Sequence, residues 1–313
     1  MNETYLEAGK RGKNTWPRYL LGVVFILFMW FVVGGWAVLA LGSLLGVPTG
    51  QTATEPSSAG LIAGYLVLGA GFPFFLLGTL LAVALIHRRN PLTLVTGRRS
   101  IDWRRTGTGF GVSLALVALA GLVEFLIYPS ALSLGPNLAA FAPFALLALV
   151  LTPIQATAEE VFFRGYLVQG ASLISSNFLF LALISGTLFM LPHLLANPEV
   201  DAGFLPVALY YFGFGAFLAW VSLRDGTLEL AIGAHAANNL YGAVVLSFEG
   251  SALKTPSLFY TDRFVPAYNL IQFLVIAVLF YVAVFVLHPL LARWVSSAEQ
   301  SPPETTVGSR CTT

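Results

Sequence analysis

Long apolar stretches are the feature that most constrains how this chain can fold. A bilayer's hydrocarbon core of about 30 Å is crossed by about 20 apolar residues of helix. Polar and Pro- or Gly-rich breaks divide the 313-residue chain into eight such stretches, near 19–46, 60–86, 107–128, 139–172, 178–195, 203–223, 227–247 and 266–291. Charged residues make up only 10% of the sequence, against about 25% in a typical soluble domain. We therefore predict an all-α, polytopic transmembrane bundle of about eight spans.

Basic residues are distributed unevenly over the predicted loops. With eight spans and the N-terminus inside, the cytoplasmic side collects Lys10, Arg11, Lys13, Arg18, Arg88, Arg89, Arg98, Arg99, Arg104, Arg105, Arg224 and Arg293. The outer loops keep only Lys254 and Arg263. Because cytoplasmic loops carry the excess of basic residues, this pattern predicts that both termini face the cytoplasm.

The sequence predicts one membrane domain over residues 1–295, with its polar motifs in a core at about 139–247. The remaining residues, 296–313, are rich in Ser, Thr and Pro, a composition that predicts a disordered tail. The net charge of +1 gives no field that would attract nucleic acid. The single cysteine, Cys311, excludes disulfides within the chain and zinc sites built from several cysteines.

Ionisable side chains inside the apolar spans are few, and they are the candidates for function. A charge deep in a span costs at least about 2.5 kcal/mol, so such residues usually face the bundle interior. The polar candidates are Glu159, Glu160 and Arg164 in the fourth span, His193 in the fifth, and His235 and Asn239 in the seventh. For His87, His288, Glu124 and Glu229, which lie at or near span ends, we expect interfacial or structural roles.

Helical spacing makes this set chemically coherent. Glu160 and Arg164 are four residues apart on one face and can form an ion pair. Glu159 points about 100° away, which leaves it free for another task. An antiparallel hairpin of the fourth and fifth spans brings the carboxylates and His193 to a similar depth, within roughly 8 Å of helical rise. A carboxylate and a histidine can activate water, while a histidine and an asparagine amide can stabilise an oxyanion.

Three short motifs in this region resemble those of a known family. Residues 159–164 (EEVFFR) resemble an EExxxR motif, 189–193 (FMLPH) an FxxxH motif, and 235–239 (HAANN) an HxxxN motif. These three motifs, in this order and on separate apolar helices, are those of the CAAX protease and bacteriocin-processing intramembrane proteases. Each motif alone is weak, whereas the three together are a specific signal. The resemblance covers about a quarter of the chain.

The resemblance implies a core of four helices, here the fourth to seventh spans, around a water-accessible cavity that is open toward the cytoplasm. It makes Glu159 and His193 the water-activating pair and Glu160 with Arg164 the supporting ion pair. His235 and Asn239 would polarise the scissile carbonyl. Phe189, from the second motif, would be a supporting residue.

The sequence leaves the cofactor open. The family is described both as metalloproteases and as glutamate-dependent proteases without a tightly held metal. Two histidines and a carboxylate can ligate zinc with one open position. Here they come from separate helices, without the HExxH spacing that would be specific for zinc.

Two other functions remain as alternatives to an intramembrane endopeptidase. The chain could be a catalytically silent membrane scaffold or peptide-binding protein of the same fold. It could also be a proton-coupled transporter, although that activity gives no reason for the three motifs to occur together. For an endopeptidase, the partners are the lipid bilayer and a peptide or protein substrate: a prenylated C-terminal peptide, a leader peptide or another membrane protein.

Overall fold

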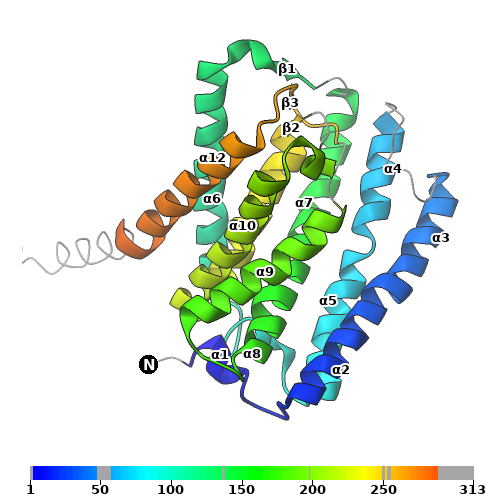
Figure 1. The fold of residues 1–313 in the computed structure, drawn as a ribbon. Coiled ribbons are helices and arrows are strands. Elements are labelled where there is room, and N and C mark those ends of the chain that lie inside the picture. The colour runs from blue at the N-terminus through cyan, green and yellow to red at the C-terminus, as the bar shows by residue number, and fades with distance from the viewer. Residues whose placement is uncertain are drawn as a thin grey trace, which may run out of the picture.

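The computed structural model describes residues 3–47, 58–135, 138–196, 198–248, 251 and 255–287. It is a bundle of long helices (Figure 1). The α-helices are α1 (Tyr5–Ala8), α2 (Trp16–Leu27), α3 (Gly35–Leu45), α4 (Ser58–Gly69), α5 (Phe72–Leu81), α6 (Trp103–Ile127), α7 (Leu138–Glu160), α8 (Val168–Ala171), α9 (Phe178–Ala196), α10 (Phe204–Asp225), α11 (Glu229–Leu240) and α12 (Pro266–Tyr281). Wider π-helical turns occupy Phe28–Gly34, Ala82–Ile86, Val161–Leu167, Tyr241–Val245 and Val282–Leu287. Short 3-10 helices cover Pro91–Leu94, Pro129–Ala131 and Pro198–Ala202.

The predicted helical membrane bundle is confirmed. In the described part of the chain, seven helical segments are long and apolar enough to cross a membrane: Trp16–Leu45, Gly60–Ile86, Trp103–Ile127, Leu138–Ala171, Phe178–Leu195, Phe204–Asp225 and Pro266–Leu287. These correspond to all the expected spans except 227–247.

The expected span at 227–247 is the shorter helix α11 followed by the π-helical turn Tyr241–Val245. Most of the α11 side chains are buried by neighbouring helices, so this helix needs less apolar surface than one that faces lipid. A total of eight spans stays a prediction. The tail at 296–313 and His288 lie outside the described residues.

Two glycines allow α9 and α10 to pack closely in the middle of the bundle. A Cβ atom on Gly186 of α9 would lie 2.6 Å from the backbone oxygen of Phe212. A Cβ atom on Gly215 of α10 would lie 2.9 Å from the Cα atom of Gly186. Small residues let membrane helices approach at backbone distance, so this contact fixes where α10 presents its side chains to the motif residues of α9.

Three short strands join loops at the end of the bundle opposite α1 (Figure 1). They are β1 (Leu132–Leu134), β2 (Leu246–Phe248) and β3 (Phe259–Thr261), in the order β1-β3-β2. β3 pairs antiparallel with β1 and parallel with β2. The strands connect segments that follow α6 and α11 to the segment that precedes α12, and the apolar pattern of the sequence gave no sign of them.

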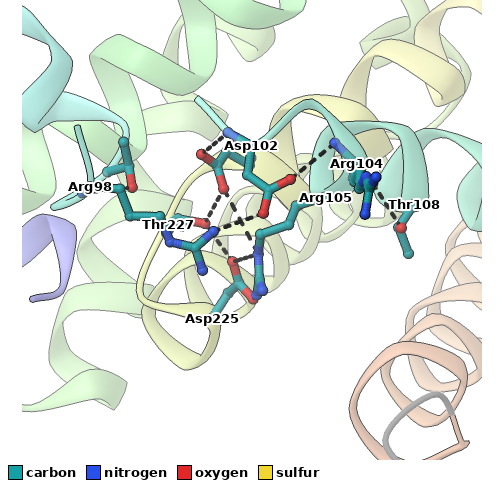
Figure 2. Close-up of polar contacts among 9 residues, drawn as sticks. Arg98, Asp102, Arg104, Arg105, Thr108, Asp225 and Thr227 are labelled. Carbon is teal, nitrogen blue, oxygen red and sulfur yellow. Dashed lines mark hydrogen bonds and ion pairs between the residues drawn. The ribbon is translucent and has the colours of Figure 1, made fainter. Parts of the chain in front are cut away.

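A polar cluster fixes the turn between α10 and α11 against the start of α6 (Figure 2). Glu229 is fully buried, and its carboxylate accepts hydrogen bonds from the backbone amide of Asp102 at 2.7 Å and from the Thr227 hydroxyl at 3.2 Å. The Arg105 side chain reaches Asp225, with its Nε 3.1 Å from Oδ2. Since α11 carries His235 and Asn239, this cluster helps to hold one motif helix in place.

His87 lies in a buried polar junction, which corrects the interfacial role expected from its place at a span end. Its side chain is fully buried. Its Nε2 lies 2.9 Å from the Tyr166 hydroxyl, and its Nδ1 lies 3.1 Å from both the Lys13 carbonyl oxygen and Asn14 Oδ1. The expectation failed because residues 13–14, which precede α2, fold back over the end of α5.

The protonation of His87 makes the stability of the fold depend on pH. Burial and the nearby charge of Arg89 lower the pKa of His87 to about 4, from about 6.5 in an unfolded chain. The unfolded chain therefore binds a proton first as the pH falls. The contribution of neutral His87 to the free energy of unfolding is complete above the pKa of the unfolded chain. It is lost as the pH falls to the pKa of the folded protein. We expect the melting temperature in detergent to decrease as the pH is lowered from about 6.5 to about 4.

Because carboxylates also titrate toward the acidic end of that window, His87→Gln is the matched control. This variant keeps a polar side chain and loses the titration. Its melting temperature should change less with pH than that of the wild type. Parallel pH profiles for the two proteins would contradict the assignment to His87.

Candidate active site

Four segments bring the motif residues together in the interior of the bundle. Glu159 and Glu160 end α7, Arg164 follows in the π-helical turn Val161–Leu167, Phe189 and His193 lie on α9, and His235 and Asn239 lie on α11. π-helical turns inside α-helices often occur at functional sites. Contacts between these residues form a continuous network across three long helices.

Glu160 is the centre of this network. One of its oxygens, Oε1, lies 3.0 Å from Arg164 Nη1 and 2.6 Å from His235 Nδ1. The side chains of Glu160 and Arg164 are both fully buried. The ion pair expected from the spacing is therefore present. The contact with His235 was not foreseen, because it joins residues 75 positions apart.

The contacts of the two ring nitrogens of His235 determine its orientation and which nitrogen carries the hydrogen. Nδ1 faces the Glu160 carboxylate, which can only accept a hydrogen bond, so Nδ1 carries a hydrogen. Nε2 lies 3.1 Å from Asn239 Nδ2 and 3.7 Å from Glu159 Oε2. The longer distance exceeds that of a hydrogen bond. His235 therefore turns Nε2 toward Glu159 and Asn239, while Glu160 fixes the opposite side of the ring.

Glu159 and Glu160 occupy different environments, although they are adjacent in sequence. Glu159 is buried, and its Oε1 accepts a hydrogen bond from Gln155 Nε2 at 3.3 Å. Its second oxygen, Oε2, has no hydrogen-bond partner among the described residues. Glu160 also has an Oε2 atom without a hydrogen-bond partner among the described residues, but its Oε1 meets a cation and a histidine. Glu159 meets an amide and lies beside His235. Separate roles for the two carboxylates stay a prediction.

Phe189 connects the first two motifs. The Arg164 guanidinium carbon lies 4.2 Å from the centre of the Phe189 ring, a cation–π contact. The backbone oxygen of Phe189 lies 2.7 Å from His193 Nδ1. Because a carbonyl oxygen only accepts, Nδ1 of His193 carries the hydrogen and Nε2 is available as a base in the neutral ring. No hydrogen bond joins His193 to Glu159 among the described residues, but the two lie near enough to interact electrostatically.

Helix α10 contacts the site through residues that lie outside the three motifs. The Phe214 ring lies edge-on to His235, with ring centres 5.1 Å apart. The backbone oxygen of Gly215 accepts a hydrogen bond from Arg164 Nη2 at 3.4 Å. On α7, Gln155 precedes Glu159 by one helical turn, and its polarity within an apolar span could have identified it. The residues on α10 are apolar or small, so the sequence gave no signal for them.

A cavity of about 260 Å³ lies beside the motif residues, between α6, α10, α11 and α12. Its wall follows α6 from Ser113 to Glu124 and includes Tyr211, Phe214 and Asn238 next to the site. None of the motif residues lines it in the described part of the chain. This cavity therefore differs from the one that the resemblance implied, because α6 and α12 bound it together with α10 and α11. A cavity open toward the cytoplasm stays a prediction.

Protein metal sites are built from grouped His, Cys, Asp or Glu side chains. Within the described ranges, no group of three or more His, Cys, Asp or Glu side chains is placed to hold one. His235 Nδ1 contacts Glu160 Oε1, and His193 Nδ1 faces a backbone carbonyl. Metal-bound histidines make the same contacts through the nitrogen that does not coordinate, so these two hydrogen bonds are compatible with either type of protease.

Comparison with known proteins agrees with the three motifs. Residues 138–241 match the model of the family described as type II CAAX prenyl endopeptidase Rce1-like, and this segment contains every motif residue from Glu159 to Asn239. The chain is also 36% identical over 192 residues to the uncharacterized protein YyaK of Bacillus subtilis (strain 168). That alignment covers 61% of this chain and 64% of YyaK. No solved structure matches. Residues 138–241 are thus similar to the Rce1-like family of type II CAAX prenyl endopeptidases, in the segment that holds the three motifs.

Proposed function

We propose that this protein is an intramembrane endopeptidase in which Glu159 and His193 activate the attacking water. The family to which residues 138–241 are similar is a family of endopeptidases. The observation that supports the proposal most strongly is the contrast between two adjacent carboxylates. Glu160 Oε1 contacts both the Arg164 cation and His235, while Glu159 accepts a hydrogen bond from the neutral Gln155 amide and lies 3.7 Å from His235 Nε2.

In the proposed reaction, Glu159 accepts a proton from a water molecule, with His193 Nε2 as the second group that orients it. The resulting hydroxide adds to the scissile carbonyl carbon, and the carbonyl oxygen becomes an oxyanion. Glu159 then gives its proton to the leaving amide nitrogen as the carbon–nitrogen bond breaks. The products are a carboxylic acid and an amine, and the carboxylate is restored.

Asn239 is the group proposed to face the oxyanion, with His235 holding its amide in place. His235 itself donates to the oxyanion only when Nε2 is protonated, because its Nδ1 hydrogen is directed at Glu160. The Asn239 amide has two hydrogens. One can point at His235 Nε2, 3.1 Å away, which leaves the other for a substrate oxygen. An amide held in place in this way stabilises charge as it develops. Glu160 and Arg164 would act through His235, by fixing its ring rather than by touching the substrate.

The substrate class and the orientation are further parts of the proposal. The family description names prenyl endopeptidases, so peptides with a prenylated C-terminal cysteine are the first candidates. Leader peptides and other membrane proteins are the remaining ones. The uneven distribution of basic residues supports cytoplasmic termini, with a site that is open toward the cytoplasm.

Cleavage by the purified protein tests this function directly. The protein in detergent is incubated with a proteome-derived peptide library and, separately, with prenylated and unprenylated versions of the same C-terminal peptides. Mass spectrometry identifies products, and we expect new termini that the wild type produces and Glu159→Gln does not. Binding without cleavage would support the scaffold instead. Proton-coupled uptake into liposomes without cleavage would support the transporter.

A further inference from the structure

Helix α10 presents a row of residues toward the site at positions 211, 214 and 215. Phe214 contacts His235 and Gly215 contacts Arg164. Tyr211, one turn before Gly215, contacts His193: the two rings lie 4.4 Å apart between centres, with planes inclined by 23°. Positions three and four residues apart share one helical face. A single face of α10 therefore reaches residues of all three motifs.

The His193 imidazole packs against two aromatic rings. Phe189, on the same helix, lies 4.3 Å away between ring centres at an angle of 34°. Tyr211, from α10, is the second neighbour, and its ring is stacked on the imidazole. Two aromatic rings in contact with the imidazole restrict its rotation. The hydrogen bond between Nδ1 and the Phe189 carbonyl, at 2.7 Å, fixes the remaining freedom and directs Nε2 away from that carbonyl.

Tyr211 is itself held from outside the helix bundle. Its hydroxyl donates a hydrogen bond to Glu199 Oε2 at 3.3 Å. Glu199 belongs to the 3-10 helix Pro198–Ala202, which follows α9 directly. Glu199 follows His193 by six residues in the sequence. Its carboxylate binds the Tyr211 hydroxyl, and the Tyr211 ring packs against His193. Tyr211 and Glu199 also line the cavity beside the site.

We propose that Tyr211 is a positioning residue for His193, and that Glu199 fixes Tyr211 in turn. This inference rests on the proposed function only for its effect on turnover, because the orientation of the imidazole is a property of the folded protein. Supporting residues that fix the rotamer of a catalytic group are needed for precise geometry. A displacement of about 1 Å can lower a rate by about a hundredfold.

The test separates the stacked ring from the hydroxyl. Tyr211→Phe keeps the ring, Tyr211→Leu removes it, and Glu199→Ala keeps the ring but removes its anchor. Tyr281→Leu is the matched control, since Tyr281 lies on α12 and packs against Phe285, 5.1 Å away between ring centres. The first measurement needs no substrate: the rate at which diethyl pyrocarbonate modifies His193, followed by mass spectrometry. We expect several-fold faster modification in Tyr211→Leu, a smaller increase in both Tyr211→Phe and Glu199→Ala because each removes the hydrogen bond between the hydroxyl and Glu199, and the wild-type rate in Tyr281→Leu.

The second measurement is turnover of a cleaved peptide as a function of pH. We expect Tyr211→Leu to lower kcat by about ten- to a hundredfold while KM changes little, and to shift the acidic limb of the pH profile. A merely structural role would reduce the folded fraction without moving that limb. Wild-type modification rates in both Tyr211→Leu and Glu199→Ala would overturn the proposal. If modification accelerates while Glu159→Gln still cleaves peptide, the positioning stands and the proposed mechanism fails.

Discussion

Arg164→Ala is expected to lose about 3–5 kcal/mol of folding free energy, because it leaves a buried carboxylate without its cation. Glu160 and Arg164 are both fully buried, with Oε1 and Nη1 3.0 Å apart. The variant also loses the cation–π contact with Phe189 and the hydrogen bond to the Gly215 carbonyl. Since Glu160 orients His235 as well, we expect turnover to fall with stability.

The chain offers a matched control for this change. Arg98 and Asp102 form an ion pair with the same spacing, and Nη1 and Oδ2 are 2.8 Å apart. Both of these side chains are about one-third exposed, so water screens the pair and it should contribute only about 0–1 kcal/mol. Thermal melting in detergent and peptide turnover are measured for Arg164→Ala and Arg98→Ala in parallel. Equal melting temperatures for the two variants, with full turnover in Arg164→Ala, would show that burial of the Glu160–Arg164 pair has no such cost.

The class of fold could be predicted from the sequence because lipid imposes a simple rule. Each crossing needs about 20 apolar residues in a helix, and seven such segments occur in the described chain. The rule is less informative for α11, which is short and packed among other helices. It says nothing about β1, β2 and β3, because three-residue strands in loops leave no hydrophobic period.

The candidate site could be predicted as a set of residues but not as a network. Spacing on one helix was enough for the contact between Glu160 and Arg164, which needs no knowledge of other helices. The contact between Glu160 and His235 depends on how α7 packs against α11, and a single sequence does not contain that information. Tyr211 was missed for a different reason, because an aromatic residue in an apolar span is most often part of the core.

The second large effect is expected for Glu159→Gln, which keeps the shape of the side chain and removes its charge. Glu159 accepts a hydrogen bond from Gln155 on Oε1, and its Oε2 has no hydrogen-bond partner among the described residues. It lies 3.7 Å from His235 Nε2 and close to His193. A glutamine there can still accept a hydrogen bond from Gln155, so the bundle should keep its structure. It cannot take a proton from water, so the chemical step should be lost.

Glu159 is the proposed base in peptide hydrolysis. The most direct test is the single-turnover rate of Glu159→Gln with a confirmed peptide substrate, alongside peptide affinity and melting temperature. Glu7→Gln on α1, outside the site, is the control. We predict that Glu159→Gln binds the peptide with near-wild-type affinity, melts like the wild type and cleaves at least about a hundredfold more slowly. Near-wild-type cleavage by the folded variant would contradict the account and would show that Glu159 is not the base.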